Sequence, residues 1–260
     1  MATLEQMVGM GFSEDAAKDA LEAHGNGALD ALLGQPREAS PQAIIAPISQ
    51  YDVENGRSAC TCIAVEAALQ ILRGYADGVW AGTSDCVSNY VTFGVSSYKA
   101  VAAAGTLSVE HTSVAEILAS VARYRDALQP ATAQVTHQGL LGSDTCIAKV
   151  LRDIGSARQA KHKPAAVAIT KPPETVVCFL PPEGHAATTG APSSWLLFDS
   201  HPRPQLGLVG ASVRSFGGEG ALIEALNAIF PAFDLGAEGN NSVMASMYNM
   251  FDCAPLSLKN

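Results

Sequence analysis

Residues 60–75 read CTCIAVEAALQILRGY, and the larger part of the chain is organised around this segment. Its apolar side chains recur at helical spacing, at positions 63, 65, 68, 69 and 72. A polar, turn-like segment, Asn55-Gly56-Arg57-Ser58, comes directly before it. The sequence therefore predicts a long apolar helix that begins at about Cys60.

Other helices and a later group of strands surround this segment in the sequence. Helical patterns cover residues 112–128, 143–153 and 219–230. Short segments rich in β-branched or aromatic residues, separated by Pro/Gly turns, cover residues 165–170, 175–180, 194–201, 211–216 and 246–251. Helices followed by a run of strands favour an α+β fold over a parallel βαβ array.

The composition sets limits on the class of protein. The chain has 260 residues, of which 48% are hydrophobic and 16% charged, so it can bury a sizeable core and is not disordered throughout. Its formal net charge is −9, from 25 acidic and 16 basic residues. Because such a chain repels a phosphate backbone, we expect no nucleic-acid partner.

The chain shows no pattern for membrane insertion or export. No apolar run reaches the length of a membrane span. The first residues, MATLEQMVGMGF, lack the basic region and apolar core of a signal peptide. We therefore expect an intracellular monomer, cytoplasmic or nuclear, without a membrane partner.

The cysteines indicate neither a disulfide framework nor a metal site. Six are present, at positions 60, 62, 86, 146, 178 and 253. Cys60 and Cys62 form a close pair, but no second pair completes a zinc site. No His-Glu-x-x-His stretch or P-loop occurs, and the Gly-rich run at 217–220 is interpreted as a strand-to-helix turn. We expect no cofactor and no metal.

The chain divides into three parts. Residues 1–34 predict three short helices, at 4–8, 13–24 and 28–33, which meet in a very small core. Residues 35–47 mix three prolines with polar residues and are assigned to a linker. The remaining residues, 48–260, form the larger domain.

The first part resembles a ubiquitin-associated (UBA) domain. The resemblance rests on the Met-Gly-Phe loop, an Ala-rich middle helix, Asn26 and the final leucine pair. It implies a ubiquitin-binding surface formed by Met10, Gly11, Phe12, Leu32 and Leu33. A domain this small cannot bury all its apolar side chains, which agrees with an exposed patch. The alternative is that these side chains fill the small core.

Cys60 is the first candidate for a catalytic group. A helix amino terminus and a nearby imidazolium can lower the pKa of a thiol from about 8.5 to about 3.5–7.5, which gives a nucleophilic thiolate. The position of Cys60 at the expected helix start suits this role. Cys62 is the competitor, but it belongs to the apolar run and fits a small buried hydrophobe better.

The second candidate group is an Asp-x-His pair in residues 195–202, WLLFDSHP. Side chains two apart on a strand share a face, so Asp199 can orient His201 for acid–base chemistry. Ser200 points to the opposite face, and we expect its replacement to be mild. The alternative reading is a simple turn at a strand end. His185 is the rival histidine.

Gln50, ten residues before Cys60, is the third candidate group. An amide donor close to the nucleophile can stabilise a tetrahedral oxyanion. Asn55 is the alternative donor.

Together these features resemble papain-like cysteine proteases, and more specifically the herpesvirus tegument-type deubiquitinases. In the latter the orienting Asp precedes the His by two, after an apolar strand, as Asp199 precedes His201 here. The helix start at Cys60 is also similar to that of the MINDY-type deubiquitinases. The gap between Gln50 and Cys60 differs from both families. The resemblance implies a Cys-His-Asp thiol mechanism carried out by Cys60, His201 and Asp199, with Gln50 as oxyanion donor.

The resemblances imply a deubiquitinase that hydrolyses (iso)peptide bonds after the C-terminal glycine of ubiquitin. The UBA-like part would hold ubiquitin or polyubiquitin chains. A tail ending in Gly-Gly needs a narrow channel, walled by Trp195 or Trp80. Two alternatives remain at this point: a non-enzymatic ubiquitin-binding adaptor, and a cysteine protease for another ubiquitin-like substrate.

Overall fold

The computed structural model describes residues 42–78, 80, 82–105, 112–158, 160–182, 195–233 and 247–259, together with residues 15, 18, 21 and 22. The chain divides into two units, Met1–Ser40 and Pro41–Asn260. In the first unit the described residues are helical. The rest of the three expected helices lies outside the described residues, and so do Met10, Gly11, Phe12, Leu32 and Leu33.

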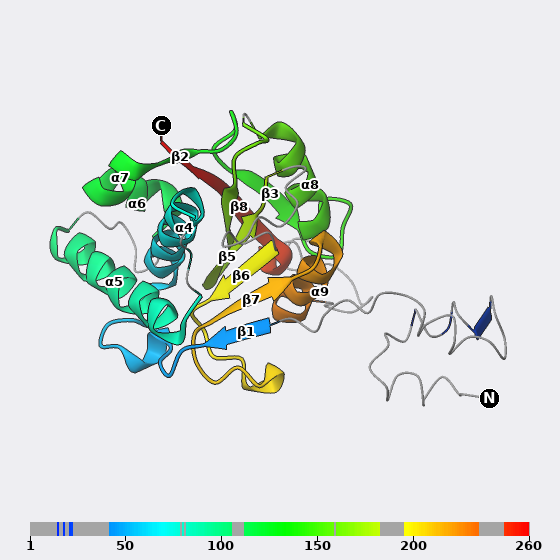
Figure 1. Ribbon diagram of the computed structural model, residues 1–260, viewed down its shortest axis with the longest axis horizontal. Coiled ribbons are helices and arrows are strands. Elements are labelled where there is room, and N and C mark those ends of the chain that lie inside the picture. The colour runs from blue at the N-terminus through cyan, green and yellow to red at the C-terminus, as the bar shows by residue number, and fades with distance from the viewer. Residues whose placement is uncertain are drawn as a thin grey trace. The chain divides into compact units, whose positions relative to one another are not determined.

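The second unit is built on one sheet of short and long strands, and every described strand pairing in it is antiparallel (Figure 1). The strand order is β1-β7-β6-β5-β4-β8-β2, and β3 also pairs with β8. The strands are β1 (Gln42–Ile45), β2 (Leu128–Pro130), β3 (His137–Leu140), β4 (Ala165–Lys171), β5 (Glu174–Leu180), β6 (Trp195–Asp199), β7 (Ser212–Phe216) and β8 (Met250–Leu258).

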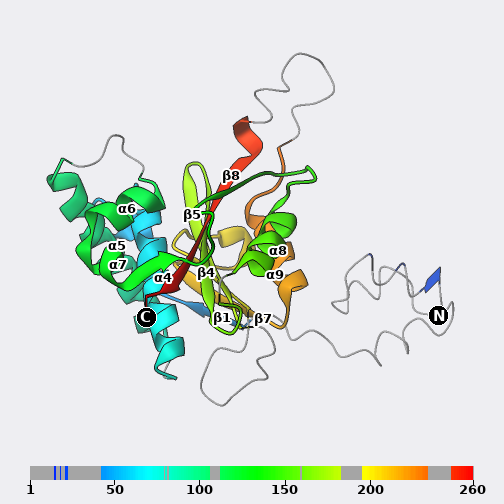
Figure 2. The same ribbon diagram turned by 90° about the horizontal axis from the view of Figure 1, so that it is seen from above.

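Helices cover both faces of this sheet (Figure 2). One face carries α4 (Cys60–Ala76), α5 (Ser84–Ala103), α6 (Val114–Ser120) and α7 (Ala122–Ala127). The other face carries α8 (Ile147–Ala157) and α9 (Glu219–Ile229). Within the described residues, no helix combines the length and apolar composition that crossing a membrane requires.

Each central strand contributes to two hydrophobic cores, because successive side chains point to opposite faces. On β4, Ala166 and Ala168 belong to the core under α4 and α5, whereas Val167 and Ile169 belong to the core under α8 and α9. Strands covered on both faces read as continuous apolar runs instead of alternating ones. This is why segments such as AAVAI could be recognised in the sequence.

Helix α4 is buried from Cys60 through Leu69, between the sheet and α5. Helix α5 packs against the first turn of α4 at Gly94. A Cβ added at Gly94 would overlap the Cα of Ile63 and lie 2.8 Å from Ile63 Cγ1. The small Ala166 and Ala168 of β4 lie in the same core. This close packing fixes the amino end of α4, and with it Cys60.

The expected α+β class is confirmed. The strands expected at 165–170, 175–180, 194–201 and 211–216 correspond to β4, β5, β6 and β7. The helices expected from Cys60, around 143–153 and at 219–230 correspond to α4, α8 and α9.

The linker expected over residues 35–47 is wrong at its carboxyl end. Gln42–Ile45 form β1 and pair with β7, with Ile44 opposite Val213. Ile44 packs against the core on the α4 side. A strand of four residues between two prolines is too short to show a period in the sequence, so its composition suggested a linker.

Three other expectations differ from the structure. The single helix over 112–128 is two helices, interrupted at Val121, whose φ of −104° and ψ of 105° are extended, and Leu128 already belongs to β2. The last strand covers Met250–Leu258 instead of 246–251. Helix α5 was not expected, because serine, threonine and asparagine dilute its apolar pattern.

Candidate active site

The amino end of α4 carries the thiol of Cys60. A tight turn precedes it, in which Asn55 has a positive φ of 64° and Gly56 lies against the backbone oxygen of Gln50. The N-cap residue, Ala59, provides no side-chain hydrogen bond to the first turn. Cys60 is only 2% exposed, and in its protonated thiol form its Sγ donates to the carbonyl of Pro173 at 3.5 Å. The partial positive charge of the helix start favours a thiolate here.

Asp199 ends β6, and His201 follows it two residues later. Asp199 Oδ1 lies 2.6 Å from His201 Nδ1 and also accepts the backbone N–H of His201 at 2.9 Å. Both side chains are buried. Because the carboxylate engages Nδ1, the ring is held in one orientation and its Nε2 remains for another partner.

Cys60 and His201 interact closely enough that each shifts the pKa of the other. Burial opposes ionisation of the Cys60 thiol, but the hydrogen bond and charge of His201, with hydrogen bonds from Thr175, outweigh it and bring the thiol pKa below its ordinary value. Burial also opposes protonation of His201, yet hydrogen bonds to Asp199 and Cys60 raise its pKa to about 9. These shifts favour a thiolate–imidazolium pair, the nucleophilic form of a cysteine.

Arg203 holds the second oxygen of Asp199. Its Nε donates to Asp199 Oδ2 at 2.8 Å, and its Nη2 donates to Glu174 Oε2 at 2.6 Å. Burial opposes ionisation of Asp199, but His201 and Arg203 keep the pKa of the carboxyl group below its usual range. Asp199 is therefore an ionised carboxylate with both oxygens engaged, a rigid support for the imidazole.

Gln50 begins the 3-10 helix η2 (Gln50–Asp52) and is 1% exposed. Its backbone N–H donates to the carbonyl of Ser200 at 3.1 Å, and its Oε1 accepts from Ser200 Oγ at 2.7 Å. Its Nε2 donates to the carbonyl of Arg57 at 3.3 Å. Gln50 thus joins the segment before Cys60 to the segment that carries His201.

The two alternatives left open by the sequence are less well placed. Asn55 is exposed in the turn before α4, whereas Gln50 is buried. Cys62 is completely buried in the hydrophobic core, and burial raises the pKa of its thiol to about 12. The opposite pKa shifts favour Cys60 over Cys62 as the thiolate, and Gln50 is the buried one of the two candidate amides.

The other histidines do not join this group in the described part of the chain. His137, on β3, lies 3.1 Å from Thr132 Oγ1, and His162 is exposed. The rival His185, together with His24 and His111, lies outside the described residues.

The two tryptophans occupy other places. Trp195 begins β6, so it lies about 13 Å along the strand from Asp199 at the rise of extended chain. It packs against the core under α8 and α9, and the structure does not bring it to Cys60 and His201. The channel-wall role expected for Trp195 is therefore not supported by its position. Trp80 lines a cavity of about 350 Å³ with Tyr90 and Phe93.

Four site residues were not anticipated from the sequence as members of the site. Thr175 interacts with Cys60 and helps to lower its thiol pKa. Glu174 and Arg203 form the ion pair behind Asp199, and Ser200 contacts Gln50. Only Arg203 had a local signal, because it continues the two-residue spacing of Asp199 and His201. The others are brought in by strand β5 and by the long-range contact with η2.

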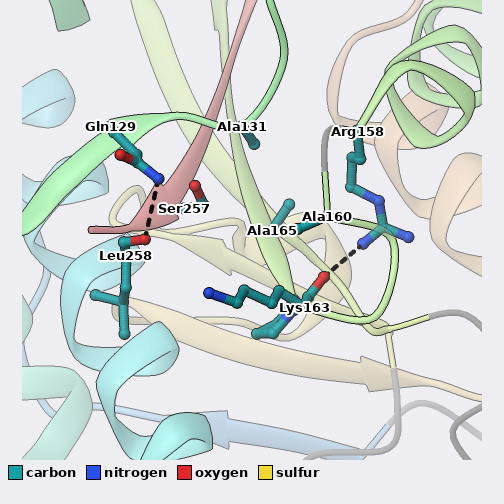
Figure 3. A pocket seen from close by; sticks show the side chains of 9 residues that line it. Gln129, Ala131, Arg158, Ala160, Lys163, Ala165, Ser257 and Leu258 are labelled. Carbon is teal, nitrogen blue, oxygen red and sulfur yellow. Dashed lines mark hydrogen bonds between the residues drawn. The ribbon is translucent and has the colours of Figure 1, made fainter. Parts of the chain in front are cut away.

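Two further cavities differ in their relation to the site. One of about 310 Å³ lies beside it and is lined by Lys171, Pro172, Pro173, Glu174, Arg203, Ile229, Phe230, Pro231, Phe233 and Tyr248. A smaller one, of about 140 Å³, contains none of the candidate site residues (Figure 3). There the Arg158 guanidinium donates to the carbonyls of Lys163, Leu180 and Pro181, which ties strand ends together.

Comparison with known proteins bears separately on the two units. Residues 2–32 match the sequence profile of the UBA/TS-N domain family. The chain carries an amino-terminal UBA domain. No curated protein matches the chain in sequence.

The fold of the chain is similar to the crystal structure of the ubiquitin-specific protease encoded by murine cytomegalovirus tegument protein M48, in complex with a ubiquitin-based suicide substrate. The two chains share 13% sequence identity with a TM-score of 0.53, over 84% of this chain and 87% of that one. The expected resemblance to tegument-type deubiquitinases is therefore confirmed at the level of the fold.

Proposed function

We propose that this protein is a cysteine-type deubiquitinase that cleaves the bond after the C-terminal glycine of ubiquitin. The observation that carries the proposal is the buried group of Cys60, His201 and Asp199, in which Asp199 Oδ1 lies 2.6 Å from His201 Nδ1 and His201 lowers the pKa of the Cys60 thiol. Two further findings support it: the UBA domain, and the fold shared with a ubiquitin-specific protease.

In the first chemical step, the Cys60 thiolate attacks the carbonyl carbon of the terminal glycine. A carbon–sulfur bond forms, and the π electron pair moves to oxygen, where the Gln50 amide stabilises the negative charge. The intermediate collapses to a thioester as the carbon–nitrogen bond breaks. His201 gives its proton to the departing amine, which is the lysine side chain in an isopeptide.

In the second step, His201 removes a proton from water, and the resulting hydroxide attacks the thioester carbon. The carbon–sulfur bond breaks, which restores the Cys60 thiolate and leaves a carboxyl group at the end of ubiquitin; this group loses its proton to bulk water and departs as the carboxylate. Asp199 stays ionised throughout and holds the imidazole in the orientation that serves both steps.

The UBA domain is proposed to hold ubiquitin through Met10, Gly11, Phe12, Leu32 and Leu33. The contact area of so small a domain makes a single contact weak. Linking it to the protease raises the effective concentration of a ubiquitin chain at the active site. We assign residues 1–34 to the UBA domain, and the protease domain includes β1.

Labelling with an electrophilic probe tests the enzyme directly. Ubiquitin that ends in a C-terminal electrophile should form one covalent adduct with the full-length protein, located at Cys60 by peptide mass mapping. Cys60→Ala should lose both the adduct and the hydrolysis of a ubiquitin–fluorophore conjugate. Cys62→Ala should keep much of both, because Cys62 is a core side chain.

The same experiment separates the alternatives. Binding of the probe without an adduct would contradict the enzyme and favour a ubiquitin adaptor. An adduct that forms with a ubiquitin-like protein carrying the same electrophile, but not with ubiquitin, would identify the ubiquitin-like protein as the substrate. An adduct on Cys62 in the wild-type protein would overturn the assignment of the nucleophile.

A further inference from the structure

Ser200 lies between Asp199 and His201 in the sequence, yet its side chain hydrogen-bonds Gln50 and not these two neighbours. It is 0% exposed, and its Oγ lies 2.7 Å from Gln50 Oε1. The sequence-based expectation that Ser200 is replaceable rested on its pointing away from Asp199 and His201. The Ser200 side chain instead hydrogen-bonds Gln50, so its replacement can still affect the site.

The hydrogen bonds define which way the Gln50 amide faces. A backbone carbonyl only accepts, so the neighbour of the Arg57 carbonyl must be the NH₂ group of the amide. The carbonyl oxygen of the amide then faces Ser200, and the Ser200 hydroxyl must donate to it. Ser200 and Arg57 therefore fix the amide from its two ends.

This orientation determines what the amide can offer a substrate. An amide nitrogen has two N–H groups, and within the described residues the Arg57 carbonyl is the acceptor found for one of them. The backbone of Gln50 is also anchored, because its N–H donates to the Ser200 carbonyl at 3.1 Å. Both the main chain and the side chain of Gln50 are thus held by Ser200.

We propose that Ser200 is a positioning residue, which holds the Gln50 amide so that its second N–H donates to the oxyanion. This rests on the proposed thiol hydrolase function. When Cys60 attacks, the negative charge passes from sulfur to the carbonyl oxygen of the substrate, and the positioned N–H meets it there. The tripeptide Asp199-Ser200-His201 would then orient the imidazole and the oxyanion donor together.

Replacement of Ser200 should affect turnover selectively. In Ser200→Ala the Gln50 Oε1 loses its donor, and the amide is free to rotate away. We expect kcat on a ubiquitin–fluorophore conjugate to fall about 10- to 100-fold, somewhat less than loss of a whole oxyanion donor, with KM little changed. Ser215→Ala, on the neighbouring strand β7, is the matched control and should keep wild-type turnover.

Two further readouts distinguish positioning from general damage. Alkylation of Cys60 by iodoacetamide forms no oxyanion, so its rate and pH profile should be unchanged in Ser200→Ala. A Gln50→Ala variant should already lack the donor, so adding Ser200→Ala to it should cause no further loss. Melting curves check that each variant is folded.

A short peptide aldehyde, acetyl-glycyl-glycinal, tests the idea without ubiquitin. Its reversible adduct with Cys60 places a tetrahedral oxygen at the same position, and its affinity is read from protection against iodoacetamide. We expect Ser200→Ala to weaken it about tenfold, even if the wild-type protein fails to cleave ubiquitin, an outcome that would overturn only the proposed function. Three outcomes would overturn the positioning role. The first is an equal aldehyde affinity in wild type and Ser200→Ala. The others are slower alkylation of Cys60 in Ser200→Ala and additive losses of turnover in the double variant.

Discussion

Two cysteines separated by one residue illustrate how position within a single helical turn determines thiol chemistry. Cys60 begins α4, where the helix start, His201 and Thr175 all favour the thiolate. Cys62 faces the hydrophobic core, where burial raises its thiol pKa to about 12. The difference follows from environment alone, because both side chains are otherwise identical.

Asp199→Asn tests the electrostatic role of Asp199 through the pH dependence of turnover. Hydrogen bonding to Asp199 raises the His201 pKa towards about 9, so removing that charge must lower it. The alkaline limb of the kcat/KM profile, where His201 loses its proton, should move to lower pH. We expect kcat/KM to fall on the order of 10²-fold, because the amide also favours the wrong tautomer.

The comparison variants are His201→Ala and His185→Ala. His201→Ala should lose more activity than Asp199→Asn, since Cys60 then lacks its proton-transfer partner. His185→Ala should retain the wild-type profile. An inactive His185→Ala, or an Asp199→Asn enzyme with an unshifted alkaline limb, would contradict the assignment of base and orienting acid.

Site residues differ in how readily sequence reveals them. Asp199 and His201 could be paired from their two-residue spacing, which is typical of side chains on one face of an extended strand. In the structure β6 ends at Asp199 and His201 lies in a bend, where Asp199 Oδ1 accepts its backbone N–H. The partner of Ser200 is 150 residues away in the sequence, and Thr61 and Thr175, which hydrogen-bond each other beside the site, are separated by 114. No local pattern encodes such contacts.

At the scale of elements, the site forms where four chain segments end or begin. These are the amino end of α4, the carboxyl end of β6, the start of β5 and the short helix η2. The long apolar runs made α4 and the central strands predictable. Strands β1 to β3 are three or four residues long, below the length at which a period can be counted.

Gly94→Ala tests the packing that fixes the amino end of α4. The added methyl group would overlap the backbone of Ile63, so α5 or α4 must shift. We expect the free energy of unfolding to fall by about 1–3 kcal/mol, typical of overpacking, although alanine has the higher helix propensity. Chemical denaturation monitored by circular dichroism measures this change.

Gly155→Ala in α8 is the matched control for this substitution. Nothing lies within 4 Å of the position its Cβ would take. The same exchange should therefore raise the free energy of unfolding by roughly 0.5–1 kcal/mol, through helix propensity alone. If both variants changed stability in the same direction and by the same amount, close approach at Gly94 would not be the cause.

At the scale of the whole molecule, the order of elements was enough to predict the α+β class. Helices α4 to α7 come before most of the sheet in sequence, and the central strands follow as a group. The covering of the second sheet face by α8 and α9 was not predictable from that order. It depends on apolar side chains from β4 to β7 that point away from α4.

The proposed roles of the UBA domain and the protease domain can be separated by varying the length of the substrate. Changing Met10 and Phe12 together to alanine should weaken cleavage of long ubiquitin chains, with kcat/KM lowered roughly tenfold, because the tethered contact raises local substrate concentration. Hydrolysis of a mono-ubiquitin–fluorophore conjugate should barely change, since neither residue contributes a catalytic group. Both rates are measured on the full-length chain.

Glu22→Ala, at an exposed helical position of the first unit, is the control and should leave both rates unchanged. The ratio of the two rates is the decisive quantity, because a general loss of active protein lowers both equally and leaves the ratio as it was. Selective loss on chains requires that the apolar loop contact a second ubiquitin of the same chain. Equal losses on both substrates, with normal melting curves, would instead place Met10 and Phe12 in the recognition of the first ubiquitin and refute a purely tethering role.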